Sequence, residues 1–493
     1  MAQTLQGPGA FAGRTLGWVW PLATFAACAA IALRPDIALL VLGAVAFVAS
    51  AVIWPRVTVA LSVLAILGAR TLLHLVGVEQ VTYLDEAVVV LCAVVLPLRR
   101  ICTGKGLRAL PGQYWFALAC ALGLAGGLVV GMPTTTLLSG AFVMLKGVLF
   151  GWAVAQVNWN ERDLRAAARA GVVLVVVCLA AVGANLAAPG AWALLLANKG
   201  GLEYRGSIPS LIGPFVHPLD LGQVMVAATI SLLAWRATVD KRLLTLVLMI
   251  GTGLAALLTF RRTAVTALLV GILWMKAKLG SARALLAAAL AVPLLAILLI
   301  GPLESIVSRT YADYIVAGDT SARTLLTRDS FAVAAEHFPL GAGLGRFGSE
   351  IAAQNYSPEY VARGYPAIWG LGPTKETGQF LTDTEWPAII GETGLLGAIA
   401  FALGLAAIYR RGRRLCASGA QPLVRWAGLT AMGWVVTSLV LSIASVVFTG
   451  PPAYALLFGL AGILAALSDP TDRPGPGSES TVDRKPVRVL ERQ

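Results

Sequence analysis

The sequence predicts an all-α polytopic integral membrane protein with one large extracytoplasmic loop. Hydrophobic residues make up 58% of its 493 positions and charged residues only 13%, whereas an ordinary soluble domain carries roughly 25% charged residues. The apolar residues fall into runs of about 17–22, the length at which a helix crosses the hydrocarbon core of a bilayer. Because lipid offers the backbone no hydrogen-bond partner, these runs are expected to be helices.

We expect about fourteen membrane spans, and no fewer than about twelve, from the lengths of the apolar runs. Their expected positions are 17–33, 37–54, 57–76, 83–98, 114–131, 137–157, 170–188, 217–235, 243–259, 262–275, 284–300, 384–408, 427–447 and 453–467. Arg261 and Arg262 separate two short runs and are expected to mark a tight turn at one membrane surface. One long broken helix is the alternative there.

Basic residues cluster in alternate loops, as the positive-inside rule describes for cytoplasmic loops. The clusters are Arg99, Arg100, Lys105 and Arg108; Arg162, Arg165 and Arg169; Arg236, Lys241 and Arg242; Lys276, Lys278 and Arg283; and Arg410, Arg411, Arg413 and Arg414. This distribution places both termini in the cytoplasm and accounts for the net charge of +13 without a nucleic-acid partner. We expect a membrane domain over 1–467, with its first span retained as an anchor, and a disordered cytoplasmic tail over 468–493.

Neither a disulfide framework nor a protein-built metal centre is expected. The six cysteines lie in predicted spans or cytoplasmic loops, and the large external loop has none. The sequence contains no metal-ligand spacing of histidines and cysteines and no Walker loop. Residues 343–348 match G-x-G-x-x-G. That match lies in an external loop, without the strand, helix and βαβ unit that a dinucleotide site needs.

Two external segments, 189–216 and 301–382, collect polar residues, and the second is too long for a simple connection. The aromatic residues of the second segment include Tyr311, Tyr314, Tyr356, Tyr360, Tyr365 and Trp369. Aromatic faces beside charged groups suit sugar rings and their phosphates. The alternative is a folded cap in which the aromatic residues form the core or an interfacial belt.

Arginines on the external side run against the positive-inside bias and call for a reason. They are Arg205, Arg261, Arg262, Arg323 and Arg328. A guanidinium group offers a planar fork that matches phosphate oxygens, so several converging arginines would bind a pyrophosphate. The alternative is salt bridging to the acidic residues Asp313, Asp319, Asp329 and Glu336.

Ionisable residues within spans are functional candidates because charge at depth in a bilayer is expensive. Lys146 and Glu392 lie inside predicted spans, and Asp220 begins one, shortly after His217. Glu385 and Glu392 are separated by nearly two helical turns, so they are expected to share a helix face.

Asp383 precedes the helix that carries these two glutamates. Two interpretations of it stay open from the sequence. An acidic residue at this point caps the N-terminus of a helix, where it satisfies backbone N–H groups and the helix dipole. A carboxylate there would equally serve as a general base. One residue could do both.

Three passages carry a resemblance to a known family. The first is Arg205 followed by Gly-Pro-Phe-Val-His-Pro-Leu-Asp at 213–220, and the second is Leu-Thr-Phe-Arg-Arg-Thr-Ala at 258–264. The third runs from Arg323 through His-Phe-Pro-Leu-Gly-Ala-Gly-Leu-Gly at 337–345 to Asp383 and Glu-Thr-Gly-Leu-Leu-Gly at 392–397. In this order they resemble the motifs of the O-antigen ligase and polymerase superfamily of bacterial cell envelopes, over roughly residues 200–400.

The resemblance implies a membrane-embedded glycosyltransferase of the C type that acts at the external face of the bacterial inner membrane and needs no cofactor. Its partners would be an undecaprenyl-diphosphate-linked glycan, an acceptor glycan or lipid, a chain-length regulator and a flippase. Arg205, Arg262 and Arg323 would hold the diphosphate and neutralise charge on the leaving group. The candidate catalytic carboxylates are Asp383, Glu385 and Glu392, and the further candidates for substrate binding are Arg261, His217, Asp220, Arg328 and His337.

The sequence departs from the ligase pattern at one point. Where ligases carry a His-Asn pair before the E-T-G-L-L-G glutamate, this chain has Asp383 and Thr384. A carboxylate can still accept a proton from an acceptor hydroxyl. We therefore expect polymerisation of an exopolysaccharide, capsule or O-antigen repeat unit, with ligation as the alternative. A transporter or flippase is the alternative from another class, although no internal repeat with matching hydropathy is visible.

Overall fold

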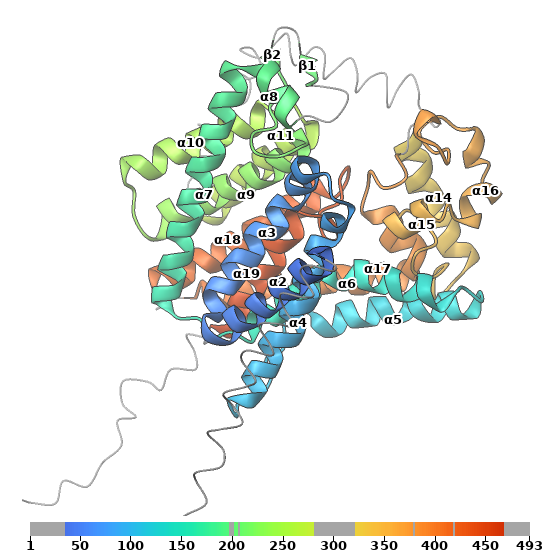
Figure 1. Ribbon diagram of the computed structural model, residues 1–493, viewed down its shortest axis with the longest axis horizontal. Coiled ribbons are helices and arrows are strands. Elements are labelled where there is room, and N and C mark those ends of the chain that lie inside the picture. The colour runs from blue at the N-terminus through green and yellow to red at the C-terminus, as the bar shows by residue number, and fades with distance from the viewer. Residues whose placement is uncertain are drawn as a thin grey trace, which may run out of the picture.

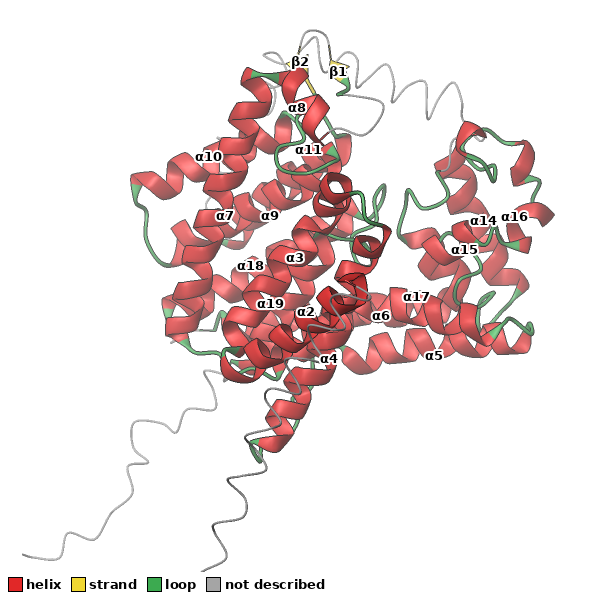
Figure 2. Ribbon diagram, viewed as in Figure 1, coloured by secondary structure: helices red, strands yellow, loops and turns green. Residues whose placement is uncertain are grey.

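The computed structural model describes residues 35–196, 202–205, 208–280, 321–377, 380–417 and 420–467. The predicted spans at 17–33 and 284–300 and the predicted tail at 468–493 lie outside these residues, as does the part of the large loop at 301–320. Helices dominate the described chain, and the only sheet in it is a hairpin of two short strands (Figure 2).

The helices form a bundle, and a group of shorter outer helices between residues 322 and 362 lies to one side of it (Figure 1). The α-helices of the described residues are α2 (Pro35–Ile53), α3 (Pro55–Val76), α4 (Leu84–Cys102), α5 (Gln113–Val129), α6 (Thr134–Ala155), α7 (Glu161–Ala187), α8 (Pro189–Leu196), α9 (Pro218–Thr238), α10 (Leu243–Leu257), α11 (Arg262–Lys278), α14 (Ala322–Glu336), α15 (Glu350–Gln354), α16 (Pro358–Ala362), α17 (Trp386–Leu415), α18 (Pro422–Leu441) and α19 (Ala453–Ala466). The remaining elements are β1 (Tyr204–Arg205), β2 (Ile208–Pro209) and the 3-10 helices η1 (Glu79–Tyr83), η4 (Tyr365–Ala367) and η5 (Lys375–Thr377).

A helix lies at every predicted span that falls within the described residues. Seven stretches are long and apolar enough to cross a membrane: Pro55–Val76, Val81–Cys102, Thr134–Ala155, Glu161–Ala187, Pro218–Thr238, Trp386–Leu415 and Pro422–Leu441. Four shorter apolar helices accompany them, at Val41–Ile53, Gln113–Val129, Leu243–Leu257 and Ala453–Ala466. The all-α, membrane-embedded class is therefore confirmed, and the count of fourteen spans stays a prediction. The turn expected between the ninth and tenth spans is also present, because α10 ends before Arg261 and α11 begins at Arg262.

Local signals in the sequence set where several helices begin. Asn160 and Asp163 form a reciprocal capping box at the start of α7, in which each side chain accepts a hydrogen bond from the other residue's backbone N–H. Ser321 accepts a hydrogen bond from the backbone of Thr324 at the start of α14. At α9, His217 Nδ1 accepts from a backbone N–H at 3.2 Å, and the proline that follows fits the first helical position.

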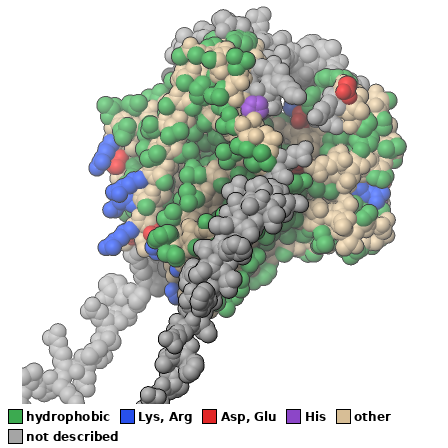
Figure 3. All heavy atoms as spheres, in the orientation of Figure 1, with side chains coloured by type: hydrophobic (Ala, Val, Ile, Leu, Met, Phe, Trp, Pro, Cys, Tyr) green, Lys and Arg blue, Asp and Glu red, His purple; other side chains and the backbone are tan. Residues whose placement is uncertain are grey.

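Basic residues gather at one end of the bundle. Arg56 Nε at the start of α3 lies 3.1 Å from Asp163 Oδ2. Arg100 Nη1 near the end of α4 donates to Asn158 Oδ1 at 3.2 Å. Figure 3 shows Lys and Arg side chains along one edge of a largely hydrophobic face. Arg70 lies near the other end of α3, about 21 Å away along the helix, so the two arginines of this helix mark opposite ends of the bundle.

A buried ionic cluster joins α4, α6 and α19. Lys146 Nζ lies 3.1 Å from Asp85 Oδ2 and 2.9 Å from Glu86 Oε1. Tyr454 OH donates to Asp85 Oδ2 at 3.2 Å. The sequence singles out Lys146 as a functional candidate, but this geometry gives it a packing role, because its charge is matched by two carboxylates within the helices.

The aromatic residues of the outer group are mostly core. Tyr360 and Tyr365 are fully buried and stack with ring centroids 5.5 Å apart and ring planes 14° apart. Phe347 packs against both of them. Trp369, in contrast, is 72% exposed. The interpretation of these aromatics as the core of a folded cap is therefore confirmed for Tyr360 and Tyr365.

Replacing Lys146 by methionine would leave the carboxylates of Asp85 and Glu86 buried without their cation. Breaking a buried ion pair in this way costs about 3–5 kcal/mol, so we expect the Lys146→Met variant to melt at a clearly lower temperature in detergent micelles. Lys105→Met, at an exposed loop position, is the matched control and is expected to melt like the wild type. Equal melting temperatures for both variants would contradict a stabilising ionic cluster at Lys146.

Candidate functional site

Glu385, immediately before α17, is a buried structural anchor. Its Oε2 accepts hydrogen bonds from the backbone N–H groups of Val447 at 2.6 Å and Phe448 at 3.0 Å, and its Oε1 accepts from Thr449 Oγ1 at 2.8 Å. These residues belong to the loop between α18 and α19. A carboxylate surrounded by three donors is well satisfied, so Glu385 holds this loop against the start of α17.

Glu392 holds a second loop in the same way. Its Oε1 accepts from the backbone N–H of Phe347 at 3.1 Å and from Ser349 Oγ at 2.5 Å. The backbone N–H of Gly343 also donates to the carbonyl of Glu392, at 3.1 Å. The stretch that matches G-x-G-x-x-G is thus fastened to α17 through this one residue.

Glycine is required where this loop meets α17. Gly394, inside α17, has φ +70° and ψ 177°, which interrupts the helix. A Cβ added to Gly341, whose own φ is +79°, would lie 2.3 Å from the backbone nitrogen of Gly394. Only a residue without a side chain allows this approach and this backbone conformation. The loop therefore fits into the break in the helix.

Asp383 differs from the two glutamates because its partner is a cation. Arg323 Nη2, from the first turn of α14, lies 2.9 Å from Asp383 Oδ2, and the two side chains are 36% and 33% exposed. The N-cap position of α17 falls on Glu385, and no side chain caps the helix there. The capping interpretation of Asp383 is therefore wrong, and its carboxylate faces Arg323.

Desolvation raises the pKa of Asp383 above its usual value, and the charges of Arg323 and then Arg261 oppose that rise. Asp383 consequently lies within electrostatic range of two arginines from different parts of the chain. A carboxylate with a raised pKa binds a proton more readily than an ordinary aspartate, which suits a general base.

Arg261 and His217 present two N–H groups to one another. Nδ1 of His217 accepts a backbone hydrogen bond, so the proton of the neutral ring sits on Nε2. That nitrogen lies 3.5 Å from Arg261 Nη2, which also contacts Glu203 Oε1 at 3.2 Å. Desolvation by the surrounding protein lowers the pKa of His217 to about 4, and Arg261 and Arg70 act in the same direction. An anionic oxygen within reach of both N–H groups would satisfy the two donors together.

Arg70 is a site residue that the sequence analysis missed. Its Nη1 lies 2.9 Å from Oδ1 of the buried Asp220, while half of the Arg70 side chain is exposed. Asp220, a predicted substrate-binding residue, therefore acts here by orienting an arginine. The available signal was a charge within the predicted span 57–76, since an ionisable residue at that depth is a functional candidate.

Arg323, Arg261 and Thr384 each have a buried polar atom without a hydrogen-bond partner. Nε of Arg323 and Nε of Arg261 are both unpartnered, as is the hydroxyl of Thr384. Buried donors are normally satisfied, so each calls for an explanation. Two unused donors on cations and one free hydroxyl indicate capacity for a ligand that carries anionic and hydroxyl oxygens.

A cavity of about 440 Å³ opens beside this cluster, within the size range of small-molecule sites, roughly 300–1,000 Å³. Its polar lining includes Arg70, Ser349, Glu350, Gln354, Tyr356, Thr382, Thr384, Glu385, Glu392, Thr393 and Thr449. Glu385 and Glu392 both line it, although Glu385 lies just before the first residue of α17.

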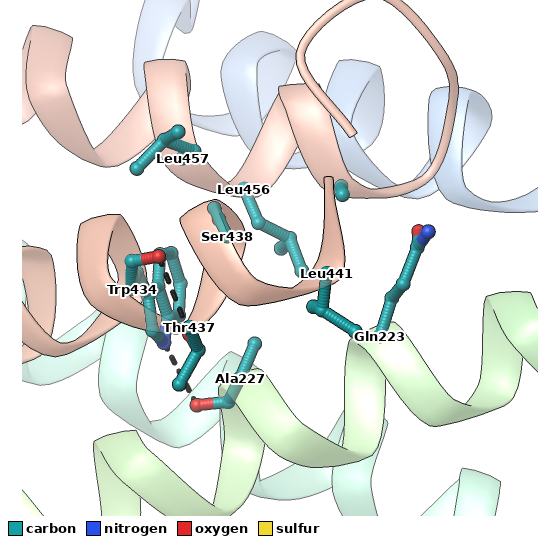
Figure 4. A pocket seen from close by; sticks show the side chains of 9 residues that line it. Gln223, Ala227, Trp434, Thr437, Ser438, Leu441, Leu456 and Leu457 are labelled. Atoms are coloured by element: carbon teal, nitrogen blue, oxygen red, sulfur yellow. Dashed lines mark hydrogen bonds between the residues drawn. The ribbon is translucent and has the colours of Figure 1, made fainter. Parts of the chain in front are cut away.

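A second cavity lies between α9, α18 and α19 and measures only about 20 Å³ (Figure 4). Trp434 of α18 donates to the carbonyl of Ala227 on α9 at 2.8 Å beside it. A space of this size accommodates a single water molecule, so it is too small for a saccharide.

The other predicted residues are not part of the lining of the 440 Å³ cavity. Arg205 sits in β1, opposite Ile208, and Arg262 is the first residue of α11, next to Arg261. Arg328 is 60% exposed and contacts Asp329 at 3.1 Å. His337 follows the last residue of α14, about 21 Å along that helix from Arg323, and does not line the 440 Å³ cavity.

Glu336, His337 and Glu359 are the one group of three potential metal ligands found among the described residues. The carboxylate of Glu359 is already paired with Arg346 at 3.0 Å and with Arg363 at 2.7 Å. Guanidinium groups thus supply the positive charge that a metal ion would bring. This network ties α14 to α16 and lies apart from the cavity.

No protein-family model matches the chain, and no curated protein matches it significantly. The resemblance of residues 200–400 to the O-antigen ligase and polymerase superfamily therefore stays a prediction. What the described residues provide is a charged cluster beside a cavity, assembled from segments far apart in the sequence.

Two near-isosteric substitutions test whether Glu385 has a structural role and Asp383 a catalytic one. Glu385→Gln would turn an acceptor of three hydrogen bonds into a group with two donors of its own, and leaving buried donors unsatisfied costs about 1–3 kcal/mol. We expect a lower melting temperature for Glu385→Gln and little change for Asp383→Asn, whose side chain is partly exposed. Thermal unfolding of both purified variants in the same detergent checks this. A larger loss for Asp383→Asn would contradict the division of roles.

Proposed function

We propose that the protein is a membrane-embedded glycosyltransferase that polymerises a bacterial cell-surface polysaccharide. It would transfer a glycan from undecaprenyl diphosphate to an acceptor sugar at the external face of the inner membrane, with both termini in the cytoplasm. The observation that carries the proposal is the convergence of arginines on Asp383 beside a cavity. The resemblance of residues 200–400 to the O-antigen ligase and polymerase superfamily supports it independently.

The arginine cluster consists of Arg70, Arg261 and Arg323, and its positive charge favours a diphosphate as the ligand. Arg323 and Arg261 each retain a buried N–H without an acceptor, and Arg70 is oriented by a buried aspartate at the cavity wall. Guanidinium groups bind phosphate oxygens through paired hydrogen bonds. A diphosphate offers enough oxygens for several such contacts, whereas a single carboxylate does not.

The proposed reaction is a direct displacement at the anomeric carbon of the donor. An acceptor hydroxyl oxygen forms a bond to that carbon, the bond from the carbon to the diphosphate oxygen breaks, and undecaprenyl diphosphate leaves. The carboxylate of Asp383 takes the proton of the hydroxyl. Arginines neutralise the charge that grows on the leaving group, a contribution of several kcal/mol in comparable sites.

The ion pair between Arg323 and Asp383 gives this reaction an order. A bound diphosphate would compete with Asp383 for the guanidinium group of Arg323. Losing that partner raises the proton affinity of the carboxylate, so binding of the donor prepares the base. Glu385 and Glu392 would shape the cavity, since each accepts hydrogen bonds from the loop that it holds.

Ligation of the glycan to a lipid or other acceptor is the second candidate function. It would use the same donor and the same arginines. Ligases of the resembled superfamily carry a His-Asn pair where this chain has Asp383 and Thr384, which favours polymerisation. A chain-length regulator and a flippase are the partners that a polymerase would need, whereas the chain itself would need no cofactor.

Deleting the gene in its host and complementing it with variants tests the function. We expect single repeat units to accumulate on the lipid carrier, and Arg323→Ala and Asp383→Ala to restore less than about one hundredth of the polymer, a loss of about 3 kcal/mol or more. Arg328→Ala is the matched control on the same helix and is expected to restore it fully, because that side chain is exposed and pairs with its neighbour.

Other outcomes of this experiment are informative. Long polymer that persists on the lipid carrier, with only its transfer lost, would identify a ligase. Unchanged surface glycan, or full rescue by Arg323→Ala with normal amounts of protein in the membrane, would refute the binding of a diphosphate by the arginine cluster. A transporter or scaffold would then be the better explanation.

The fall of the reaction rate at low pH tests whether Asp383 is the general base. Activity requires the ionised carboxylate, so the rate falls as pH drops through its pKa, which lies above the ordinary value. Arg323 lowers that pKa, so the residual activity of Arg323→Gln is expected to fall off at a higher pH than wild-type activity. Release of undecaprenyl diphosphate from lipid-linked repeat units in proteoliposomes provides the rate. If the activity of Arg323→Gln falls at the same pH as wild-type activity, or at a lower pH, Asp383 is excluded as the base.

A further inference from the structure

We infer that the 440 Å³ cavity is a subsite for an uncharged saccharide, which serves as the acceptor. This inference rests on the proposed function and specifies its second substrate. The cavity lies next to the base in sequence and in space, because Thr382 and Thr384, on either side of Asp383, both line it. An acceptor hydroxyl held there would lie close to Asp383, which Arg323 of α14 contacts at 2.9 Å.

The charge of the lining disfavours an acidic sugar. Glu350, Glu385 and Glu392 line the cavity, and Arg70 is the one basic residue among the described residues of the wall. That arginine is paired with Asp220 at 2.9 Å, and in the proposed function it is occupied by the diphosphate of the donor. A uronic acid would therefore place its carboxylate near several others with no unpaired cation to match it, which costs binding energy.

Hydrogen-bonding groups in the cavity lining suit the hydroxyls of a sugar. Thr384 is only 3% exposed, and its Oγ1 has no partner in the protein. A threonine hydroxyl both donates and accepts, as a sugar hydroxyl does, so the two satisfy each other. Gln354 also lines the cavity and adds an amide group, whose Nε2 donates to Glu350 Oε1 at 3.3 Å.

Part of the lining is apolar. Val143 and Met144 of α6 and Ile389 of α17 belong to this part. A pyranose ring has one face of C–H groups and a rim of hydroxyls. A lining that combines apolar side chains with polar groups is typical of a small-molecule site. A neutral saccharide can pack its C–H face on α6 and turn its hydroxyls toward Thr384 and Gln354.

Saturation-transfer NMR on the full-length protein in nanodiscs tests the inference with defined sugars. The neutral probes are cellobiose, lactose and N,N′-diacetylchitobiose, and cellobiouronic acid is the acidic counterpart of the first. We expect at least one neutral disaccharide to bind, with a dissociation constant at least about fivefold lower than that of cellobiouronic acid at pH 7. Binding by none of the neutral probes, or tighter binding of the acid, would overturn the inference.

Variants locate the binding. Thr384→Val removes one hydroxyl at nearly constant volume and is expected to weaken binding of the neutral disaccharide about fivefold, the effect of one hydrogen bond. Thr327→Val makes the same change at an exposed position on α14 and is expected to have no effect. Equal affinities for the two variants would place the sugar elsewhere and overturn the inference.

A charge reversal provides a second variant at an exposed residue. Glu350 is exposed, so Glu350→Lys is expected to fold normally while it adds a cation to the cavity wall. Cellobiouronic acid should then bind about fivefold more tightly than it binds to the wild type, with little change for the neutral sugar. No gain for the acid would contradict the electrostatic part of the inference and overturn it.

Farnesyl diphosphate, added to the same nanodiscs, separates this inference from the proposed function. Its binding is expected to disappear in Arg323→Ala, whereas binding of the neutral disaccharide should persist in that variant. If the diphosphate binds and no disaccharide does, the acceptor subsite is refuted and the arginine cluster stands. If the disaccharide binds at Thr384 and the diphosphate does not bind at all, the subsite stands and the glycosyltransferase proposal fails.

Discussion

The ion pair between Arg323 and Asp383 joins the outer helical group to the membrane bundle, and the candidate site depends on it. The two residues are 60 positions apart in the chain, and their side chains meet at 2.9 Å. Partial burial makes each charge costly alone, so each stabilises the other. The pairing nevertheless leaves Nε of Arg323 without an acceptor. The same contact therefore fixes the position of Asp383 and keeps binding capacity for an anion.

Two other carboxylates provide the rigid frame around this pair. Glu385 holds the loop between α18 and α19, and Glu392 holds the glycine-rich loop that fits against the break at Gly394. Both bind backbone N–H groups, so small movements of either loop would break several hydrogen bonds at once. A site built on such supports keeps its reacting groups in place without the help of a ligand.

The sequence predicts the helices well and the site only partly, for a physical reason. Apolar run length is a local property, so a helix occurs at every predicted span within the described part of the chain. Contacts between distant segments are not local. Arg70 and Asp220 are 150 positions apart, and the sequence marks Asp220 without its partner. Glu385 and Glu392 stand out as ionisable residues at depth, but no local pattern shows that their backbone donors come from the loops at 447–448 and 343–347.

A structure of the full-length protein in nanodiscs with farnesyl diphosphate, determined by electron cryomicroscopy, would test the central claim most directly. The account predicts phosphate density within about 2.7–3.2 Å of the guanidinium nitrogens of Arg323 and Arg261, with Asp383 released from Arg323 and facing the cavity. Diphosphate bound elsewhere, with the pair between Arg323 and Asp383 intact, would contradict it.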